Sequence, residues 1–441
     1  MSNKFRRHIS LVDAFFYSIG ISTTLLETAL ISSSFNLGHN ALEFSIVLTL
    51  LLSILSQGAL TPLFLRLGLR RVLLIGYILK FIAQIFFGIS FYLSIISDIK
   101  IVWFSMLAFM LTDSLGTGCV ISSYRPAYNI WYQEKTSMKD HIDFIGIYKE
   151  YILCRLFLPG FILFLSIVLN IYSFENHKNH SWIIAFIGTI FIMMFMRAIQ
   201  IKITWDDMFF EGRITNTDLH TNKLRYTFKE TITQAFLFLK SSPIFLTYVF
   251  CEFSASVVLL YAIGIIYRNL THTIAPLSSY GWIIATTIAF IVYFVSALFG
   301  YYIFPRIKPE NNGKAIYWSV LWITYTSAFT LFSFQNLDIK FGIASLAIFS
   351  VIAMVASDCL RRLCSNFFID SLNEEQQSIA FLYGEIFSTI ILIFFLILPF
   401  SIVDQQYLPS ILLGICLIFG FYILLLRKMI YLQIYYSKNQ N

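Results

Sequence analysis

The chain has 441 residues, of which 58% are hydrophobic and 12% are charged, and its formal net charge is +7. Soluble globular domains carry about 25% charged residues, so this composition excludes a water-soluble domain. Apolar runs such as VLLIGYILKFIAQIFFGISFYLSII reach the length of about 20 residues that a membrane-spanning helix needs. The composition therefore indicates an all-α integral membrane protein with several spans.

Hydropathy predicts twelve transmembrane helices in chain order. The first follows directly on MSNKFRRHISLVDAFF, which has no small-residue cleavage site, so we expect an uncleaved first helix rather than a signal peptide. The predicted ranges are 11–33, 44–65, 72–97, 101–124, 142–172, 182–203, 243–267, 277–303, 315–336, 341–369, 378–402 and 407–427.

The 31 Lys and Arg residues are distributed unevenly between the two sides of these helices. With the N-terminus in the cytoplasm, two of these residues, Lys80 and Arg155, lie within helices, and four lie outside: Lys100, Lys178, Arg268 and Lys340. All the others, including Arg197, lie on the cytoplasmic side. Because cytoplasmic loops are enriched in Lys and Arg, both termini are predicted to be cytoplasmic, in a bacterial inner membrane. The same rule explains the positive net charge without nucleic acid as a partner.

The longest polar interval divides the helices six and six. We expect an N-terminal bundle over 1–203, a cytoplasmic linker over 204–242 and a C-terminal bundle over 243–441. Within the linker, YTFKETITQAFLFLKSSP alternates apolar and polar residues at helical spacing. This spacing predicts an amphipathic helix on the inner membrane face, with a plain linker helix as the alternative.

Two segments of the chain resemble each other. TDSLGTGC at 112–119 and SDCLRRLC at 357–364 place Asp113 and Asp358 in equivalent apolar segments, and IYKE and LYGE end in Glu150 and Glu385. These matches occur in the same order in both halves. They predict two pseudo-symmetric six-helix bundles related by an axis along the membrane normal.

The stretch GALTPLFLRLGLRRVLLIG at 58–76 resembles the 2–3 loop signature of the major facilitator superfamily (MFS). Arg66, Gly68, Arg70 and Arg71 match that signature, whereas Leu65 stands where the family has an aspartate. The segments FKETITQAFLFLKSSPIFL and LRRLCSNFFIDSLNEEQQSIAF are also similar to family patterns.

This resemblance implies a twelve-helix secondary transporter of the MFS fold that works by alternating access, without specifying its cargo. In that fold helices 1, 4, 7 and 10 line a central cavity. A short Leu158-Pro159-Gly160 sequence resembles the family's exporter signature on helix five and favours export.

Each predicted cavity-lining helix carries one carboxylate. A charge at bilayer depth costs about 2.5–3.5 kcal/mol, so these acids must face a wet cavity, pair with a base or be protonated. Drying and rewetting such a site changes its proton affinity, as proton coupling requires. The predicted proton- or substrate-binding residues are therefore Glu27, Asp113, Glu252 and Asp358.

A structural role is the alternative for these acids. Asp358 has basic residues at helical i+3 and i+4 spacing, and Asp113 or Glu150 could neutralise Arg155. The predicted gating or charge-pairing residues are Glu150, Arg155, Glu385, Arg361 and Arg362.

The sequence contains no G-x-x-x-x-G-K-[ST], HExxH or GxSxG motif, so we expect no enzyme, no cofactor and no metal site. The leading hypothesis is a monomeric, proton-coupled exporter of a small organic or peptide-like compound. Alternatives are an importer of a nutrient or iron chelate, and an MFS-like receptor or accessory protein that moves no cargo. Its partners would be the small-molecule substrate, protons and the lipid bilayer.

Overall fold

The computed structural model describes residues 41–96, 99–136, 181–206, 227–258, 314–322, 372–402 and 408–432, with single positions or pairs between 291 and 359. All regular secondary structure in these residues is helical, which confirms the all-α fold class. The twelve-helix count stays a prediction, because segments such as 11–33 and 142–172 lie outside the described residues.

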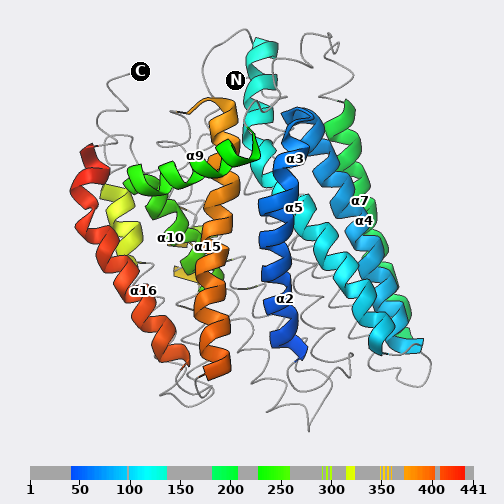
Figure 1. Cartoon of the computed structure of the whole chain (residues 1–441). Coiled ribbons are helices and arrows are strands. Elements are labelled where there is room, and N and C mark those ends of the chain that lie inside the picture. Colours follow the sequence, from blue (N-terminus) through cyan, green and yellow to red (C-terminus); the bar gives the residue numbers. More distant parts are fainter. Residues whose placement is uncertain are drawn as a thin grey trace. The chain divides into compact units, whose positions relative to one another are not determined.

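The described helices form two compact units. The first contains α2 (Ala41–Leu55), the π-helical turn η1 (Ser56–Leu60), α3 (Thr61–Leu65), α4 (Leu69–Ile96), α5 (Ile99–Thr136) and α7 (Ser181–Trp205). Within it, α4 packs along α5, α7 packs on α4, and α2 packs on α5 (Figure 1). Buried Phe87 and Phe109 fill the space between α4 and α5, with ring centroids 5.1 Å apart.

Three stretches of this unit are long and apolar enough to cross a membrane: Val47–Leu65, Leu69–Leu93 and Lys100–Trp131. In the second unit Gln376–Phe394 passes the same criterion, and Lys229–Ser241 with Pro243–Phe253 passes it as a pair bent by 98°. The structure therefore contains several spanning helices, as a multi-pass membrane protein requires.

A tight turn between α3 and α4 carries the 2–3 loop motif. Gly68 has a φ of 96°, which glycine adopts without the steric cost that a Cβ imposes. Leu65, at the position of the family's aspartate, is fully buried. Leu65 thus contributes to packing there, while Arg66 and Arg71 stay exposed on either side of the turn.

Helix α5 is longer than predicted. The range 101–124 ended before the polar Arg125, but the helix continues to Thr136 and includes Pro126. Tyr128 is fully buried and stacks at a tilt on Tyr124, with centroids 4.9 Å apart. The predicted end was wrong because a buried aromatic face continues at helical spacing past Tyr124, although the mean hydropathy falls.

The second unit contains α9 (Phe228–Ser241), α10 (Pro243–Val258), α15 (Glu374–Ile402) and α16 (Leu408–Leu425), with a helical segment at 314–322. Helix α10 packs on α15 and α16, and α9 packs on α15. Helix α9 begins at a capping box in which Thr227 and Glu230 satisfy each other's backbone N–H groups. Its Phe236 ring lies 5.4 Å from that of Phe387 on α15.

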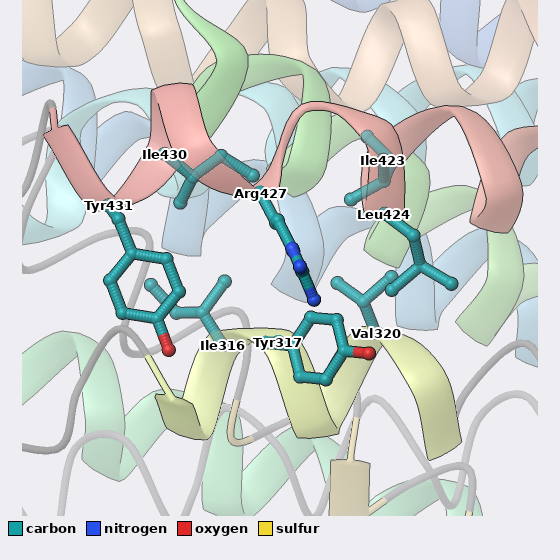
Figure 2. Close-up of a pocket in the computed structure, with 8 residues that line it drawn as sticks. All are labelled: Ile316, Tyr317, Val320, Ile423, Leu424, Arg427, Ile430 and Tyr431. Atoms are coloured by element: carbon teal, nitrogen blue, oxygen red, sulfur yellow. The ribbon is translucent and has the colours of Figure 1, made fainter.

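Beyond the end of α16, the chain stays helical and lies beside segment 314–322, where the two form a shallow groove (Figure 2). Arg427 reaches across it and places its guanidinium 5.6 Å from the Tyr317 ring centroid.

Helices α4 and α5 approach closely through two glycines. A Cβ on Gly116 would lie 2.9 Å from Lys80 Cγ and 3.0 Å from the carbonyl oxygen of Gly76. We expect Gly116→Val to lower the melting temperature of the purified protein, because overpacking a helix contact costs about 1–3 kcal/mol. Gly414→Val on α16 is the matched control, since no atom lies within 4 Å of a Cβ there. Equal melting temperatures for the two variants would contradict the close contact.

Candidate functional site: a charge cluster in the first unit

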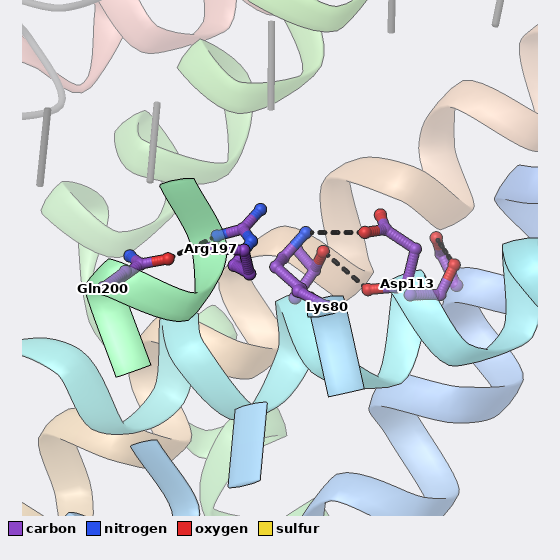
Figure 3. A network of polar contacts seen from close by, with 7 residues as sticks. Lys80, Asp113, Arg197 and Gln200 are labelled. Carbon is purple, nitrogen blue, oxygen red and sulfur yellow. Dashed lines mark hydrogen bonds and ion pairs between the residues drawn. The ribbon is translucent and has the colours of Figure 1, made fainter. Parts of the chain in front are cut away.

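A partly buried ion pair joins α4 to α5. Lys80 Nζ donates to Asp113 Oδ1 at 3.0 Å, and both residues lie in membrane-spanning stretches (Figure 3). An isolated charge at this depth would be expensive, and opposite charges in contact offset part of that cost. Asp113, a predicted proton- or substrate-binding residue, is thus held by a cation from the neighbouring helix.

A second cation comes from α7. The Arg197 side chain is fully buried and its Nη1 donates to Gln200 Oε1 at 2.7 Å. It lies close enough to Asp113 for electrostatic attraction, and Figure 3 shows its guanidinium on the side of Lys80 away from Asp113. Lys80, Asp113 and Arg197, with Gln200, form what we call the charge cluster.

The local sequence sets the geometry of the charge cluster. Lys80 lies one turn after Gly76, and the Gly76–Gly116 contact brings α4 and α5 close enough for the ion pair to form. Helix α2 is tied to the same level by a hydrogen bond of 3.1 Å between the hydroxyl groups of Ser53 and Ser114. Two helices, α4 and α2, therefore hold α5 at the level of Asp113.

The members of the charge cluster differ in exposure. The Asp113 side chain is 29% exposed, the Lys80 side chain 7%, and Arg197 1%. A molecule or proton that reaches the cluster therefore meets the carboxylate first, with the cations behind it. A partly exposed carboxylate next to a base is accessible to a proton or to a cationic group.

The second unit contains two further predicted residues, Glu252 on α10 and Glu385 on α15. Both are partly buried and both make contacts within the protein. Next to Glu385, Gly384 fits against the Tyr248 ring, where a Cβ would lie 2.5 Å from Tyr248 Cε1. Glu252 and Glu385 are thus carried by two helices in direct contact.

The other predicted site residues divide into two groups. Arg66, Gly68, Arg70 and Arg71 lie at the turn between α3 and α4, as the motif predicts. Six others lie outside the described residues: Glu27, Glu150, Arg155, Asp358, Arg361 and Arg362. The Leu158-Pro159-Gly160 sequence also lies outside them.

Sequence reasoning missed the cations of the charge cluster. Lys80 was recognised as lying within a helix but was not paired with Asp113, and Arg197 was assigned to the cytoplasmic side. The sequence did offer a signal for this ion pair: two consecutive apolar segments carry one Lys and one Asp, each near the middle of its segment. For Arg197 the signal was weaker, because it lies near the end of the predicted range 182–203 while α7 continues to Trp205.

The residues that the structure describes include no group of three or more His, Cys, Asp or Glu side chains placed to hold a metal ion. Cys119, Cys251 and Cys359 are buried free thiols.

The helices of both units have the arrangement found in transporters of the major facilitator superfamily, and the chain therefore has the MFS fold. The sequence itself matches no protein-family model and no curated protein.

Several solved transporters share this fold over almost their whole length. A bacterial homologue of the iron transporter ferroportin has a TM-score of 0.64 at 11% identity, covering 97% of this chain and 100% of that one. FucP, the fucose:proton symporter of E. coli, has a TM-score of 0.59 at 12% identity, covering 96% and 98%. The nucleoside transporter NupG has a TM-score of 0.58 at 13% identity, covering 98% and 99%. At these identities the similarity establishes the fold.

A double-mutant cycle tests the ion pair. We expect Lys80→Gln and Asp113→Asn each to lower the free energy of unfolding, because each leaves a charge with less compensation. The double variant should lose less than the sum, with a coupling of about 0.5–3 kcal/mol measured by denaturant unfolding in detergent. Lys202→Gln combined with Asp113→Asn is the control pair, and its effects should add, since Lys202 is exposed on α7. Additive effects for Lys80 and Asp113 would contradict the ion pair.

Proposed function

We propose that the protein is a secondary active transporter that works by alternating access and is coupled to protons through Asp113. The observation that carries this proposal is the Lys80–Asp113 ion pair in two apolar spanning helices, with the acid as its exposed member. The MFS fold supports it, because this is the fold of the fucose:proton symporter and the nucleoside transporter.

Proton coupling follows from competition for the Asp113 carboxylate. Lys80 from α4 contacts it directly and Arg197 from α7 attracts it from behind Lys80, while α2 offers the neutral hydroxyl of Ser53 through Ser114. A proton on Asp113 breaks the attraction to Lys80 and weakens the tie between α4 and α5. A change of state that dries or rewets the acid would in turn change its proton affinity. Proton binding and conformation are then linked.

The other predicted site residues also have roles in this proposal. Glu27, Glu252 and Asp358 are proposed to bind cargo or protons with Asp113, whereas Glu150, Arg155, Glu385, Arg361 and Arg362 serve as gating or charge-pairing residues. The cargo is proposed to be a small organic or peptide-like compound that is exported. Import of a nutrient or iron chelate is the second candidate, and the similarity to a homologue of an iron transporter and to a fucose:proton symporter supports cargo of this kind.

Alternating access can be tested without knowing the cargo. Thr117 lies one turn after Asp113 and is partly exposed. In a variant whose six native Cys are replaced, we expect Thr117→Cys to react with a membrane-impermeant maleimide in both right-side-out and inside-out vesicles, because the site opens to each side in turn. Mass spectrometry measures the labelled fraction. Labelling in one orientation only would favour the receptor that moves no cargo.

Proton coupling can be tested in the same vesicles. We expect the ratio of Thr117→Cys labelling between the two orientations to change with pH, because protonation of Asp113 would release Lys80. Asp113→Asn should abolish this dependence, and Lys80→Arg should retain it. Glu230→Gln on the exposed first turn of α9 is the matched acid-to-amide control and should behave like the parent. An unchanged pH dependence in Asp113→Asn would refute coupling through this acid.

A further inference from the structure

The membrane span that contains α2 changes its helical geometry in the middle. Val47–Leu65 is one apolar stretch, but the π-helical turn η1 separates α2 from α3 within it. At this turn the Thr61 N–H donates to the Ser56 carbonyl oxygen five residues earlier, so the turn holds one residue more than an α-helical turn. Pro62 follows at once and has no N–H to donate to the preceding turn. Helices bend at such places, because both features interrupt the regular hydrogen-bond ladder.

The two sides of η1 are held differently. On the α3 side, Thr61 and Leu65 are fully buried, and α3 packs on both α4 and α5. On the α2 side, none of the described side chains at 47–55 is buried. Leu48 and Leu52 reach the apolar core of the unit there, and both are only partly buried. Few buried contacts are typical of segments that move, so α3 is the anchored part of the span and α2 the loosely held part.

A gap in the side chains of α5 seats the turn itself. A Cβ on Gly118 would lie 2.6 Å from Thr61 Oγ1 and 2.8 Å from Gln57 Cγ. These two side chains of the turn therefore pack directly against the backbone of α5, and Gln57 is buried. Because the turn is fixed in this way and α2 is not, a movement of α2 would pivot at η1.

A hydrogen bond joins α2 to α5 beside the charge cluster. The hydroxyl groups of Ser53 and Ser114 lie 3.1 Å apart, and Ser114 is the residue after Asp113. Ser53 lies on the α2 side of η1, so this bond holds the loosely packed part of the span. A bond between two neutral hydroxyl groups is weaker than one that involves a charge, so it can break and form again.

We propose that η1 is a hinge about which α2 swings while α3 stays seated on α5, and that the hydrogen bond between Ser53 and Ser114 latches α2 in the position seen here. Hinges in proteins are a few residues at the ends of elements that absorb the change in backbone angles. The inference rests on the proposed alternating access, and it names α2 as a segment that moves next to the exposed carboxylate of Asp113.

Spin labels at exposed positions test the hinge by double electron–electron resonance in lipid nanodiscs. In a chain whose six native Cys are replaced, Leu51→Cys on α2 is paired with Leu111→Cys on α5, since these side chains are 47% and 36% exposed. We expect two separations for this pair. When Leu63→Cys on α3 takes the place of Leu51→Cys, we expect one separation, because α3 does not swing.

Two variants test the hinge and the latch with the Leu51 pair. Deletion of Ala59 removes the extra residue of η1 and restores an α-helical turn, so we expect the loss of one separation. Gly58→Ala keeps the length of the turn and should retain both. We expect Ser53→Ala to shift the population away from the latched separation. Ser90→Ala is its matched control and should leave the populations unchanged, because it removes a hydroxyl contact between α4 and α5.

The outcomes separate the hinge from the transport function. A single separation for the Leu51 pair would overturn the hinge, and so would two separations for the Leu63 pair, because the span would then move as a whole. Both separations in the Ala59 deletion would show that η1 is not the pivot. If that deletion does not fold, unchanged populations in Ser53→Ala would still overturn the latch. One separation for the Leu51 pair together with Thr117→Cys labelling from both sides would remove the hinge alone, whereas labelling from one side would remove alternating access.

Discussion

The contact between Lys80 and Asp113 is the interaction on which the charge cluster depends. Two charged residues lie in neighbouring helices that are otherwise apolar, and neither charge is tolerable there without compensation. Their contact requires the helices to be close, and the glycines at 76 and 116 provide that closeness because no Cβ separates the two backbones. Packing and charge neutralisation in the first unit are therefore parts of one arrangement.

This arrangement also makes the charge cluster responsive. A cluster closed to solvent would only stabilise the fold, and a fully exposed one would be neutralised by water and salt. Here the cations are buried and the acid is partly exposed, so the ligand or proton that reaches Asp113 changes the electrostatic balance behind it. Arg197 extends that balance to α7, so in the proposed mechanism the protonation of one carboxyl group would act on three helices.

The sequence predicted the fold class because it depends on a local property, the length of the apolar runs. It also identified Asp113 as a candidate because a charge lies within one of these runs. The residue that pairs with Asp113 could not be predicted in this way, because ion pairing depends on which faces of two helices meet. Lys80 was visible in the sequence, but its orientation toward α5 depends on the glycine contact, which hydropathy does not report. The end of α5 was misplaced for a related reason, because the buried face that continues through Tyr128 is a property of packing and not of mean hydropathy.

The contact between Arg427 and Tyr317 shows the same dependence on pairing. Arg427 appears in the sequence as one of several basic residues that follow a spanning helix, and the positive-inside rule accounts for it without a specific ligand. What distinguishes it is the Tyr317 ring beneath its guanidinium, which comes from a segment about 110 residues earlier in the chain. Asp113 and Arg427 thus differ from neighbouring charged residues by what a second helix places next to them. In a membrane protein with few charged side chains, the helix that packs against each charge decides which group compensates it.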